Sequence, residues 1–236
     1  MYKIAVFADI HANYEALKVI IDDIEKRNFN EVICLGDVLS KGASPRECFD
    51  LIIDNNVKMV YGNHEGKAQE LWAHIVELKP ETNGNLYWCM CKLEEKHKNF
   101  IMSLKQFIEL RIDNKSFLFT HYPFNKETKK YFPYKDLNDE IAEEYFKDYN
   151  YDYVFFGHHH NHKHLKYKYK NLYNLGSSGC REDEYTFYYV ITINNDKVSV
   201  RRKRLKYDRE ALKKTIVESD SPNKSHLASS FFNFNF

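Results

Sequence analysis

The first 61 residues alternate short apolar runs with amphipathic segments, and this alternation constrains the fold more than any other feature of the sequence. Residues 3–8, 31–35 and 57–61 are apolar runs of strand length. Residues 13–27 repeat apolar side chains at helical spacing, and residues 44–55 open with Ser-Pro-Arg-Glu, a capping box with proline at the first helical position. Strands that alternate with helices of this length predict an α/β sheet with helices on its faces.

The rest of the chain predicts a helical insert followed by further strands. Residues 65–102 have helical periodicity with a break at 80–85, so we place an insert at about 65–104. Beyond it we expect, in chain order, a hairpin of 107–112 and 115–120, a helix at 136–149, a buried strand at 151–156, a hairpin of 186–193 and 198–205, and a helix at 208–218. We therefore expect one domain over residues 1–218 and a loose tail over 219–236.

The composition argues against a strong general attraction to polyanions. Lysine and arginine number 35 against 34 aspartate and glutamate, and a net charge of +1 gives no field that would draw the chain to nucleic acid or an anionic membrane. The five cysteines are scattered and no signal peptide or long apolar span is seen, so we expect a reduced, cytoplasmic protein. The pair Cys89-x-Cys91 lacks the second pair that a sulfur-bound metal would need, which favours packing as its role.

Residue types that bind metals follow five of the predicted strands. Open α/β sheets bind ligands at the carboxyl ends of their strands, so we expect these side chains to converge in one crevice. They are Asp9, His11, Asp37, Asn63, His64, His121, His158 and His160. Helix capping by Asp9 or Asn13 would explain the first block equally well if it stood alone. Capping does not explain five blocks with glycines beside three of them, so the sequence favours a metal centre.

The ligand types indicate the class of ion. Carboxylate, imidazole and amide donors without a thiolate suit Mn, Fe, Co, Ni or Zn. Asp9 and His11 are two residues apart, as are His158 and His160, so in extended backbone the members of each pair face the same side. Asp37 is the best candidate to bridge two ions about 3.5–4 Å apart, a pair that clamps the attacking and leaving oxygens in phosphate-ester cleavage.

The five blocks resemble the motif set of the calcineurin-like metallophosphoesterases, namely D-x-H, G-D, G-N-H-[DE], a lone His and G-H-x-H in that order. The resemblance covers residues 3 to about 180. It implies a β-sandwich of two stacked mixed sheets flanked by helices, with the late hairpin in the second sheet. It also implies that His64 is the catalytic histidine. The implied ligands are Asp9, His11, Asp37 and His160 for one ion, and Asp37, Asn63, His121 and His158 for the other.

Within that superfamily, residues 9–13 and 174–179 look most like the small bacterial and archaeal phosphodiesterases. Protein phosphatases carry an Asp-Arg pair shortly after the G-D block, where this chain has Ser40-Lys41. Two further departures, Ala12 and the Leu175/Cys180 substitutions in the glycine-rich turn, are not expected to touch a predicted ligand.

The resemblance thus implies a phosphoesterase with two divalent ions, most simply a phosphodiesterase. A hydroxide between the ions, bridged also by Asp37, would attack phosphorus, with His64 as the acid. A phosphomonoesterase, a protein phosphatase and a non-catalytic metal-binding scaffold on the same fold are the alternatives. The presence of His64 and all seven implied ligands favours an enzyme.

Two cations, Lys41 and Arg181, are weaker candidates for contacts to the substrate phosphate, and solvated surface charge is the competing explanation. In residues 163–172, lysine alternates with tyrosine and leucine, which predicts a half-buried sheet edge with His162 and His164 exposed. A nucleic-acid groove along this basic and aromatic stretch is the alternative. We expect the partner to be a small phosphate ester, and we expect no membrane association.

Overall fold

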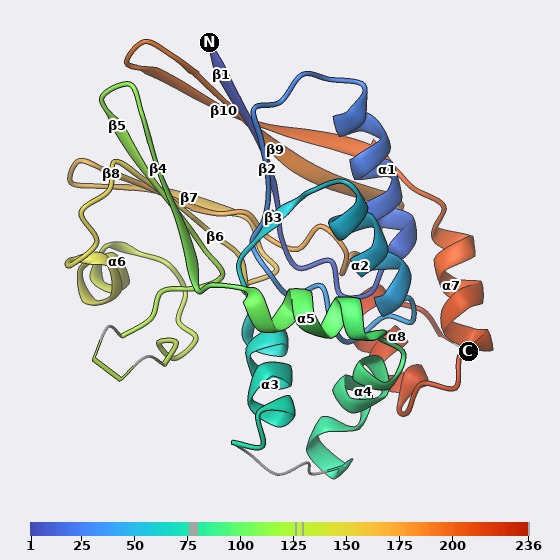
Figure 1. The fold of residues 1–236 in the computed structure, drawn as a ribbon. Helices are drawn as coiled ribbons and strands as arrows, with labels where there is room; N and C mark the ends of the chain where they lie inside the picture. The colour runs from blue at the N-terminus through green and yellow to red at the C-terminus, as the bar shows by residue number, and fades with distance from the viewer. Residues whose placement is uncertain (76–79, 126, 129, 236) are drawn as a thin grey trace.

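The computed structural model of the chain describes residues 1–75, 80–125, 127–128 and 130–235, without the side chains of 80–83. Within that part, ten strands form two five-stranded sheets that stack on each other, with eight helices around them (Figure 1). The two stacked mixed sheets that the resemblance implied are therefore confirmed.

The first sheet has the strand order β10-β9-β1-β2-β3. Its parallel part contains β1 (Tyr2–Phe7), β2 (Glu31–Cys34) and the short β3 (Lys58–Met59). The late hairpin, β9 (Tyr185–Asn194) and β10 (Lys197–Lys206), adds antiparallel to β1. The expectation that this hairpin belongs to the second sheet was wrong, because the edge of β1 opposite β2 pairs with β9.

The second sheet has the order β4-β5-β6-β8-β7. The predicted hairpin of β4 (Phe107–Ile112) and β5 (Lys115–Thr120) is confirmed to the residue, and β5 runs parallel to β6 (Tyr153–Phe156). The stretch rich in lysine and tyrosine forms a second hairpin, β7 (Lys163–Tyr167) and β8 (Lys170–Asn174), with β7 at the sheet edge as expected.

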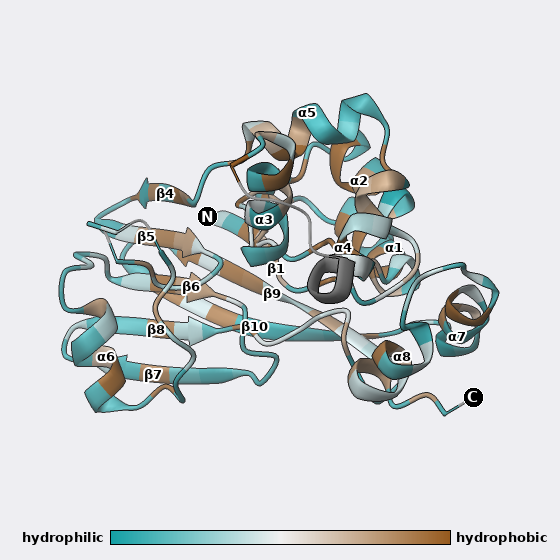
Figure 2. Ribbon diagram, turned by 90° about the horizontal axis from the view of Figure 1, so that it is seen from below, coloured by the Kyte–Doolittle hydropathy of each residue, from teal (hydrophilic) through white to brown (hydrophobic). Residues whose placement is uncertain are grey.

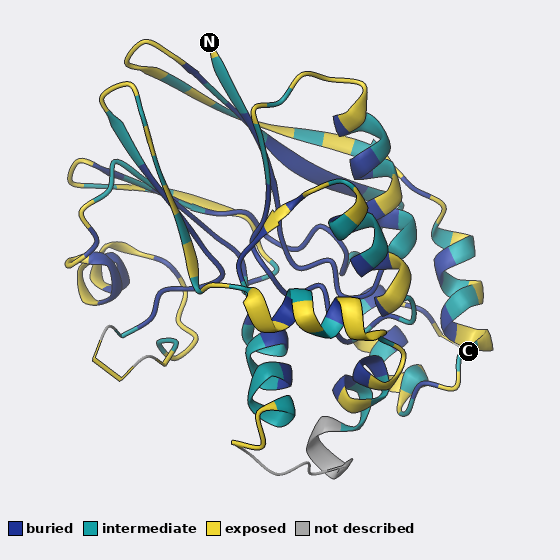
Figure 3. Cartoon of the chain, in the orientation of Figure 1, coloured by how far each residue is buried: buried dark blue, intermediate teal, exposed yellow. Residues whose placement is uncertain are grey.

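The core between the sheets is apolar, because alternate side chains of each inner face point into it. Ile4, Val6 and Ile191 of the first sheet pack with Phe119 and Phe155 of the second, and the last two rings stack at a centroid distance of 5.3 Å. Apolar stretches accordingly mark the central strands in Figure 2, and the same strands are buried in Figure 3 while the hairpin tips are exposed.

Helices cover the outer face of each sheet. Helices α1 (Tyr14–Glu25) and α2 (Pro45–Asp54) pack on the first sheet, and α6 (Asp139–Phe146) packs on the second through Ile141 and Tyr145. The helix at 44–55 begins at the predicted proline, although the Ser44 side chain makes no capping hydrogen bond.

The insert contains α3 (Asn63–Trp72), α4 (Pro80–Cys91) and α5 (Glu95–Ser103). The break expected at residues 80–85 is not found, because α4 already begins at Pro80. The side chains of 80–83 lie outside the described part of the chain. Among the described residues, no helix is both long and apolar enough to cross a membrane.

The C-terminal residues are more ordered than we expected. After α7 (Arg209–Glu218), helix α8 (Lys224–Phe232) occupies half of the segment predicted to be a loose tail. Its Phe232 and the following Phe234 are buried against α7, which gives the segment an apolar anchor that a fraying terminus lacks.

Candidate metal centre

The predicted ligands meet at the carboxyl ends of strands from both sheets. Asp9 follows β1 and Asp37 follows β2 in the first sheet, whereas His121 follows β5 and the 158–160 turn follows β6 in the second. The sequence pattern led us to expect a single sheet edge. The structure places the crevice at the shared end of the sandwich, where loops of the two sheets bond to each other; the His158 N–H donates to the Asp9 carboxylate and the Ser178 N–H to the Ala8 carbonyl.

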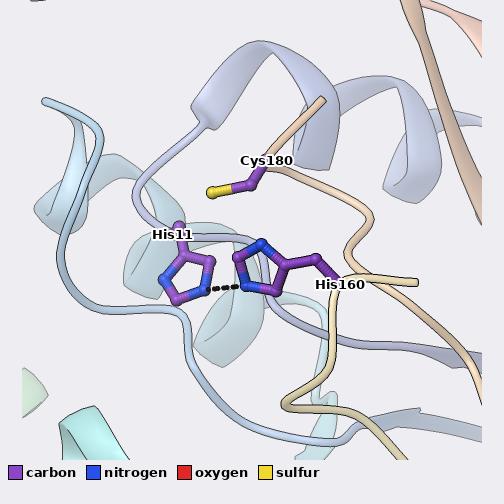
Figure 4. Close-up of side chains that lie close together, drawn as sticks. All are labelled: His11, His160 and Cys180. Carbon is purple, nitrogen blue, oxygen red and sulfur yellow. Dashed lines mark hydrogen bonds between the residues drawn. The ribbon is translucent and has the colours of Figure 1, made fainter. Parts of the chain in front are cut away.

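One cluster of donor atoms surrounds His11. Its Nε2 lies 3.1 Å from Nε2 of His160 and 3.9 Å from both Asp9 Oδ1 and Asp37 Oδ2. Its other ring nitrogen, Nδ1, lies 3.1 Å from the Leu39 carbonyl, a partner that fixes the ring and turns Nε2 toward the cluster. Figure 4 shows the two imidazoles facing each other.

A second cluster surrounds Asn63. Its Oδ1 lies 3.1 Å from Nε2 of His121 and 2.9 Å from Nδ1 of His158, and His121 Nε2 lies 3.4 Å from Asp37 Oδ2. Nδ1 of His121 is 2.8 Å from the Leu35 carbonyl, which again orients the ring.

Asp37 takes part in both clusters, since its Oδ2 approaches His11 on one side and His121 on the other. Ligand atoms that share an ion at about 2.1 Å lie about 3 Å apart, close to these separations. The donors are oxygen and nitrogen, and Asp9, His11, Asp37 and His121 are at most 2% exposed. Buried carboxylates and imidazoles of this kind could hold divalent metal ions, and Asp37 belongs to two of the groups of possible ligands.

His64 lies beside the His11 cluster, with a ring nitrogen within 4.8 Å of donor atoms of His11 and Asp37. It starts α3, its Nε2 is 3.9 Å from Asp37 Oδ2, and its ring centroid is 5.4 Å from that of His11. A quarter of its side chain is exposed, whereas the side chains of His11 and His121 are fully buried. A histidine that reaches solvent next to the ligands is placed to meet a bound substrate.

Glu65 is a structural residue that our sequence analysis did not single out. It is buried, and its carboxylate accepts four backbone N–H groups, from Asp37, Val38, Leu39 and Gly62, at 2.8–2.9 Å. These bonds fix the turn that carries Asp37 to the start of α3. The signal for it was present as the fourth letter of the G-N-H-E block.

The ligand loops use left-handed backbone rather than the extended backbone that we assumed. Asp9, His11, Asp37 and His158 have φ of 55°, 51°, 54° and 70°. Such conformations cost free energy in residues other than glycine and persist only where the surroundings enforce them. Here the backbone N–H groups of Asp9 and His11 donate to the carbonyls of Gly36 and Asp37, which provides that enforcement.

Glycines allow the close approach of the loops. Gly36 has φ of +92°, a turn that favours glycine. Gly62 and Gly157 are required for a different reason, the lack of space for a side chain. A Cβ on Gly62 would lie 2.1 Å from Asp37 Oδ1, and one on Gly157 would lie 2.3 Å from Asp9 Oδ2.

The charges of the site depend on burial and on Asp37. Burial acts to raise the pKa of the Asp37 carboxyl, but the charges of His121 and His64 outweigh it and hold that pKa well below its usual range. Burial acts to lower the pKa of His121, but the Asp37 carboxylate raises it to about 9. For His158 and His160, burial lowers the pKa to about 3, so both rings are neutral at pH 7 and able to bind metal.

Of the two candidate substrate cations, the structure brings only Lys41 to the site. Lys41 Nζ lies 3.1 Å from Nε2 of His11 and 3.3 Å from that of His160. Arg181 instead forms a bidentate ion pair with Asp183, with both N···O distances 2.9 Å, and its guanidinium lies over the ring of Phe187.

Cys180 bears on two expectations. Its sulfur and the ring nitrogens of His11 and His160 all lie within 4.8 Å of one another, so the residue does reach predicted ligands (Figure 4). We also expected a donor set without a thiolate. Burial raises the pKa of the Cys180 thiol to about 12, so the thiol beside the two imidazoles is neutral at pH 7.

The remaining histidines of the 158–164 run lie off the cluster. The His159 ring sits between the rings of Tyr122 and Tyr134, at centroid distances of 4.8 and 3.9 Å. His162 and His164 are exposed, as expected. A cavity of about 600 Å³ opens on the other side of the centre, beside Asn63, Tyr61 and Tyr131.

The fold and the centre rich in histidine and aspartate indicate a phosphoesterase. Comparison with known proteins agrees with this class. Residues 2–196 match the model of the calcineurin-like phosphoesterase superfamily domain. The chain therefore belongs to the calcineurin-like phosphoesterase superfamily.

Similar proteins include an uncharacterized protein of Methanocaldococcus jannaschii, MJ0912, which is 33% identical over 140 residues; the match spans 58% of this chain and 56% of that protein. Among solved structures, the hypothetical protein PH1004 of Pyrococcus horikoshii has a TM-score of 0.78 at 15% identity, over the full length of both chains. A protein described as a novel archaeal phosphodiesterase has a TM-score of 0.52 at 18% identity, with 86% of this chain and 99% of that chain covered. At these identities the structural likeness shows the fold.

Proposed function

We propose that the chain is a phosphoesterase that uses two divalent metal ions, and that its substrate is a phosphodiester. The observation that carries the proposal is the position of Asp37, whose Oδ2 lies within 3.4 Å of His121 Nε2 and 3.9 Å of His11 Nε2 and so touches both ligand clusters. Membership of the calcineurin-like phosphoesterase superfamily supports the reaction class.

The residues would divide the work as follows. Asp9, His11, Asp37 and His160 would hold one ion, and Asp37, Asn63, His121 and His158 the other. Bound there, the ions would supply a nucleophilic water at neutral pH and neutralise charge on the phosphate. His64, partly exposed beside Asp37, would donate a proton to the leaving oxygen. In this assignment His64 is not a ligand, although its ring nitrogen lies within 4.8 Å of donor atoms of His11 and Asp37.

Two observations support a small diester rather than a protein substrate. The fold resembles that of the archaeal phosphodiesterase, and Lys41 is a cation within reach of the His11 and His160 ring nitrogens. A phosphodiester carries one negative charge and a monoester up to two at pH 7, so a single lysine beside the ions suits the former.

The test is the initial rate of bis(p-nitrophenyl) phosphate hydrolysis by manganese-loaded protein, measured beside p-nitrophenyl phosphate and beside Asp37→Asn. Turnover of the diester that is lost in Asp37→Asn supports the proposal. Faster turnover of the monoester would contradict the diester preference. No turnover of either substrate would contradict the enzymatic function.

A further inference from the structure

The C-terminal helix returns to the metal centre and places an aromatic ring there. Phe231, in the last turn of α8, has its ring centroid 4.2 Å from Lys41 Nζ and 6.2 Å from the ring of His160. Lys41 Nζ in turn lies 3.1 Å from His11 Nε2. A segment beyond the residues that match the superfamily model, which end at 196, therefore supplies part of the wall around the predicted ligands.

The position of this ring is fixed by its neighbours. Phe232 and Phe234 are buried against α7, the Arg209 guanidinium lies 4.2 Å over the Phe234 ring, and it donates to the Phe232 carbonyl. Ala228, one turn before Phe231, is buried in the same cluster, so α8 is anchored on both sides of Phe231 and the ring has a defined place beside Lys41.

A second set of bonds ties the segment to the Lys41 loop. Asn85 of α4 accepts the backbone N–H of Lys41 at 2.8 Å, and its amide donates to the hydroxyl of Ser221 at 2.8 Å. Asp220 accepts from the Trp88 indole at 2.9 Å. The insert, the loop that bears Lys41 and the C-terminal segment therefore form one connected wall.

Phe231 differs from its two aromatic neighbours in being partly exposed, whereas Phe232 and Phe234 are buried. Among the described residues no carboxylate lies within ion-pair distance of Lys41, so an anion is its natural complement. The Phe231 ring is partly exposed and lies next to the Lys41 ammonium and the predicted metal ligands. A ligand that carries both a phosphate and a flat apolar group would match this arrangement.

We propose that Phe231 is a specificity-determining residue of this site, and that it stacks on a planar aromatic group, aryl or nucleobase, joined to the phosphate held at the metal centre and Lys41. The inference rests on the proposed function, because that function places the phosphate there. It adds the chemical class of the organic group.

The test compares ligands that differ only in the ring. The affinities of phenylphosphonate and methylphosphonate for manganese-loaded protein are measured by titration calorimetry, which needs no turnover. We expect the wild type to prefer phenylphosphonate by about tenfold, the scale of one stacking contact. Phe231→Leu keeps apolar volume but removes the flat face and should abolish the preference, whereas Phe231→Tyr should retain it. Methylphosphonate affinity should be unchanged in both variants.

A phosphonate analogue of AMP distinguishes the two sources of the aromatic group. If this analogue gains the same Phe231-dependent factor as phenylphosphonate, the group is a nucleobase; if only phenylphosphonate gains it, the group is a simple aryl. Both results support the inference.

Failure of the inference and failure of the proposed function have different signatures. If the diester is hydrolysed but wild type and Phe231→Leu show the same ratio of phosphonate affinities, the inference is overturned and the phosphoesterase stands. If no ester is hydrolysed but the preference depends on Phe231, the catalytic proposal fails and the ligand class stands. If neither phosphonate binds the wild type, the inference is overturned, and the hydrolysis test alone decides the proposed function.

Discussion

His64 is the residue whose replacement should separate catalysis from metal binding, because it is not among the ligands that we assign to either ion, although its Nε2 lies 3.9 Å from Asp37 Oδ2. We expect His64→Asn to lower kcat for bis(p-nitrophenyl) phosphate by about 10²–10⁴-fold, the usual cost of losing a general acid. Metal content by elemental analysis should be unchanged. His74→Asn, an exposed histidine just past the other end of α3, is the matched control and should keep full activity. Full activity in His64→Asn would remove it from the mechanism.

Glu65 is the residue whose loss should most disturb the turn around Asp37. In Glu65→Gln, one of the two carboxylate oxygens becomes an NH₂ group and faces two backbone donors that it cannot satisfy. We expect the free energy of unfolding to fall by about 2–4 kcal/mol, measured by urea denaturation. Glu70→Gln, on the same helix but about half exposed and paired with Lys67, should change stability by less than about 0.5 kcal/mol. Equal effects of the two variants would show that the buried bonds contribute nothing.

At this scale, the sequence predicted best the residues whose chemistry has few alternatives. The Asp, His and Asn side chains of the five blocks all lie at the centre. They were predictable because these residue types have few other reasons to recur after buried strands. The role of Glu65 was missed because its place in the G-N-H-E block does not by itself show that the carboxylate holds backbone N–H groups. Cys180 was placed away from the ligands because its proximity to His11 and His160 arises from the approach of loops that are distant in the sequence, which no local pattern encodes.

Among the elements, the start of α1 connects local helix capping to the site. The Asn13 side chain accepts the Ala16 N–H at 3.0 Å and donates to the Gly179 carbonyl at 2.8 Å, so it joins the loop after β1 to the glycine-rich turn. Asn13→Ala should therefore cost about 2–4 kcal/mol of stability and weaken metal affinity.

Asn138→Ala is the control for this change. Asn138 caps α6 through the Ile141 N–H in the same way but has no second partner near the site. Its loss should cost about 1 kcal/mol and leave metal affinity, measured by calorimetric titration, as in the wild type. A matching loss of metal affinity in Asn138→Ala would contradict a local role for Asn13.

Elements were predictable where short-range patterns determine them. The hairpins of β4–β5 and β9–β10 were found because alternating side chains flank short polar turns. The partner of β9 could not be predicted, because pairing with β1 joins residues almost 190 apart and depends on which sheet edge remains free. The order of α8 was missed because its anchors, Phe232 and Phe234, pack on α7 without a strong helical pattern of their own.

For the molecule as a whole, metal binding should release protons. The charge of Asp37 raises the pKa of His121 to about 9, so at pH 7.5 this ring is protonated, and it must be neutral to bind an ion. We expect release of at least about one proton per molecule on manganese binding. Apparent affinity should rise by about tenfold per pH unit between pH 7 and 9.

The proton count follows from calorimetric titrations in buffers of different ionisation enthalpy. His159→Asn should give the wild-type count, because burial lowers the pKa of His159 to about 4 and that ring is already neutral. Binding without proton release at pH 7.5 would contradict the charge state assigned to His121. The same raised pKa contributes stability to the metal-free protein that is complete below pH 6.5 and lost as the pH rises through about 9.

The division of the ligands between two sheets has a consequence for the life of the protein in the cell. Asp9 and Asp37 belong to loops of one layer, and His121 and His158 to loops of the other, so a bound ion is a removable cross-link across the sandwich. Free metal at a thousandfold excess over its dissociation constant would add about 4 kcal/mol to folding stability. Metal supply would then set the lifetime of the chain as well as its activity, because copies without ions open more often and expose the apolar interior to proteases.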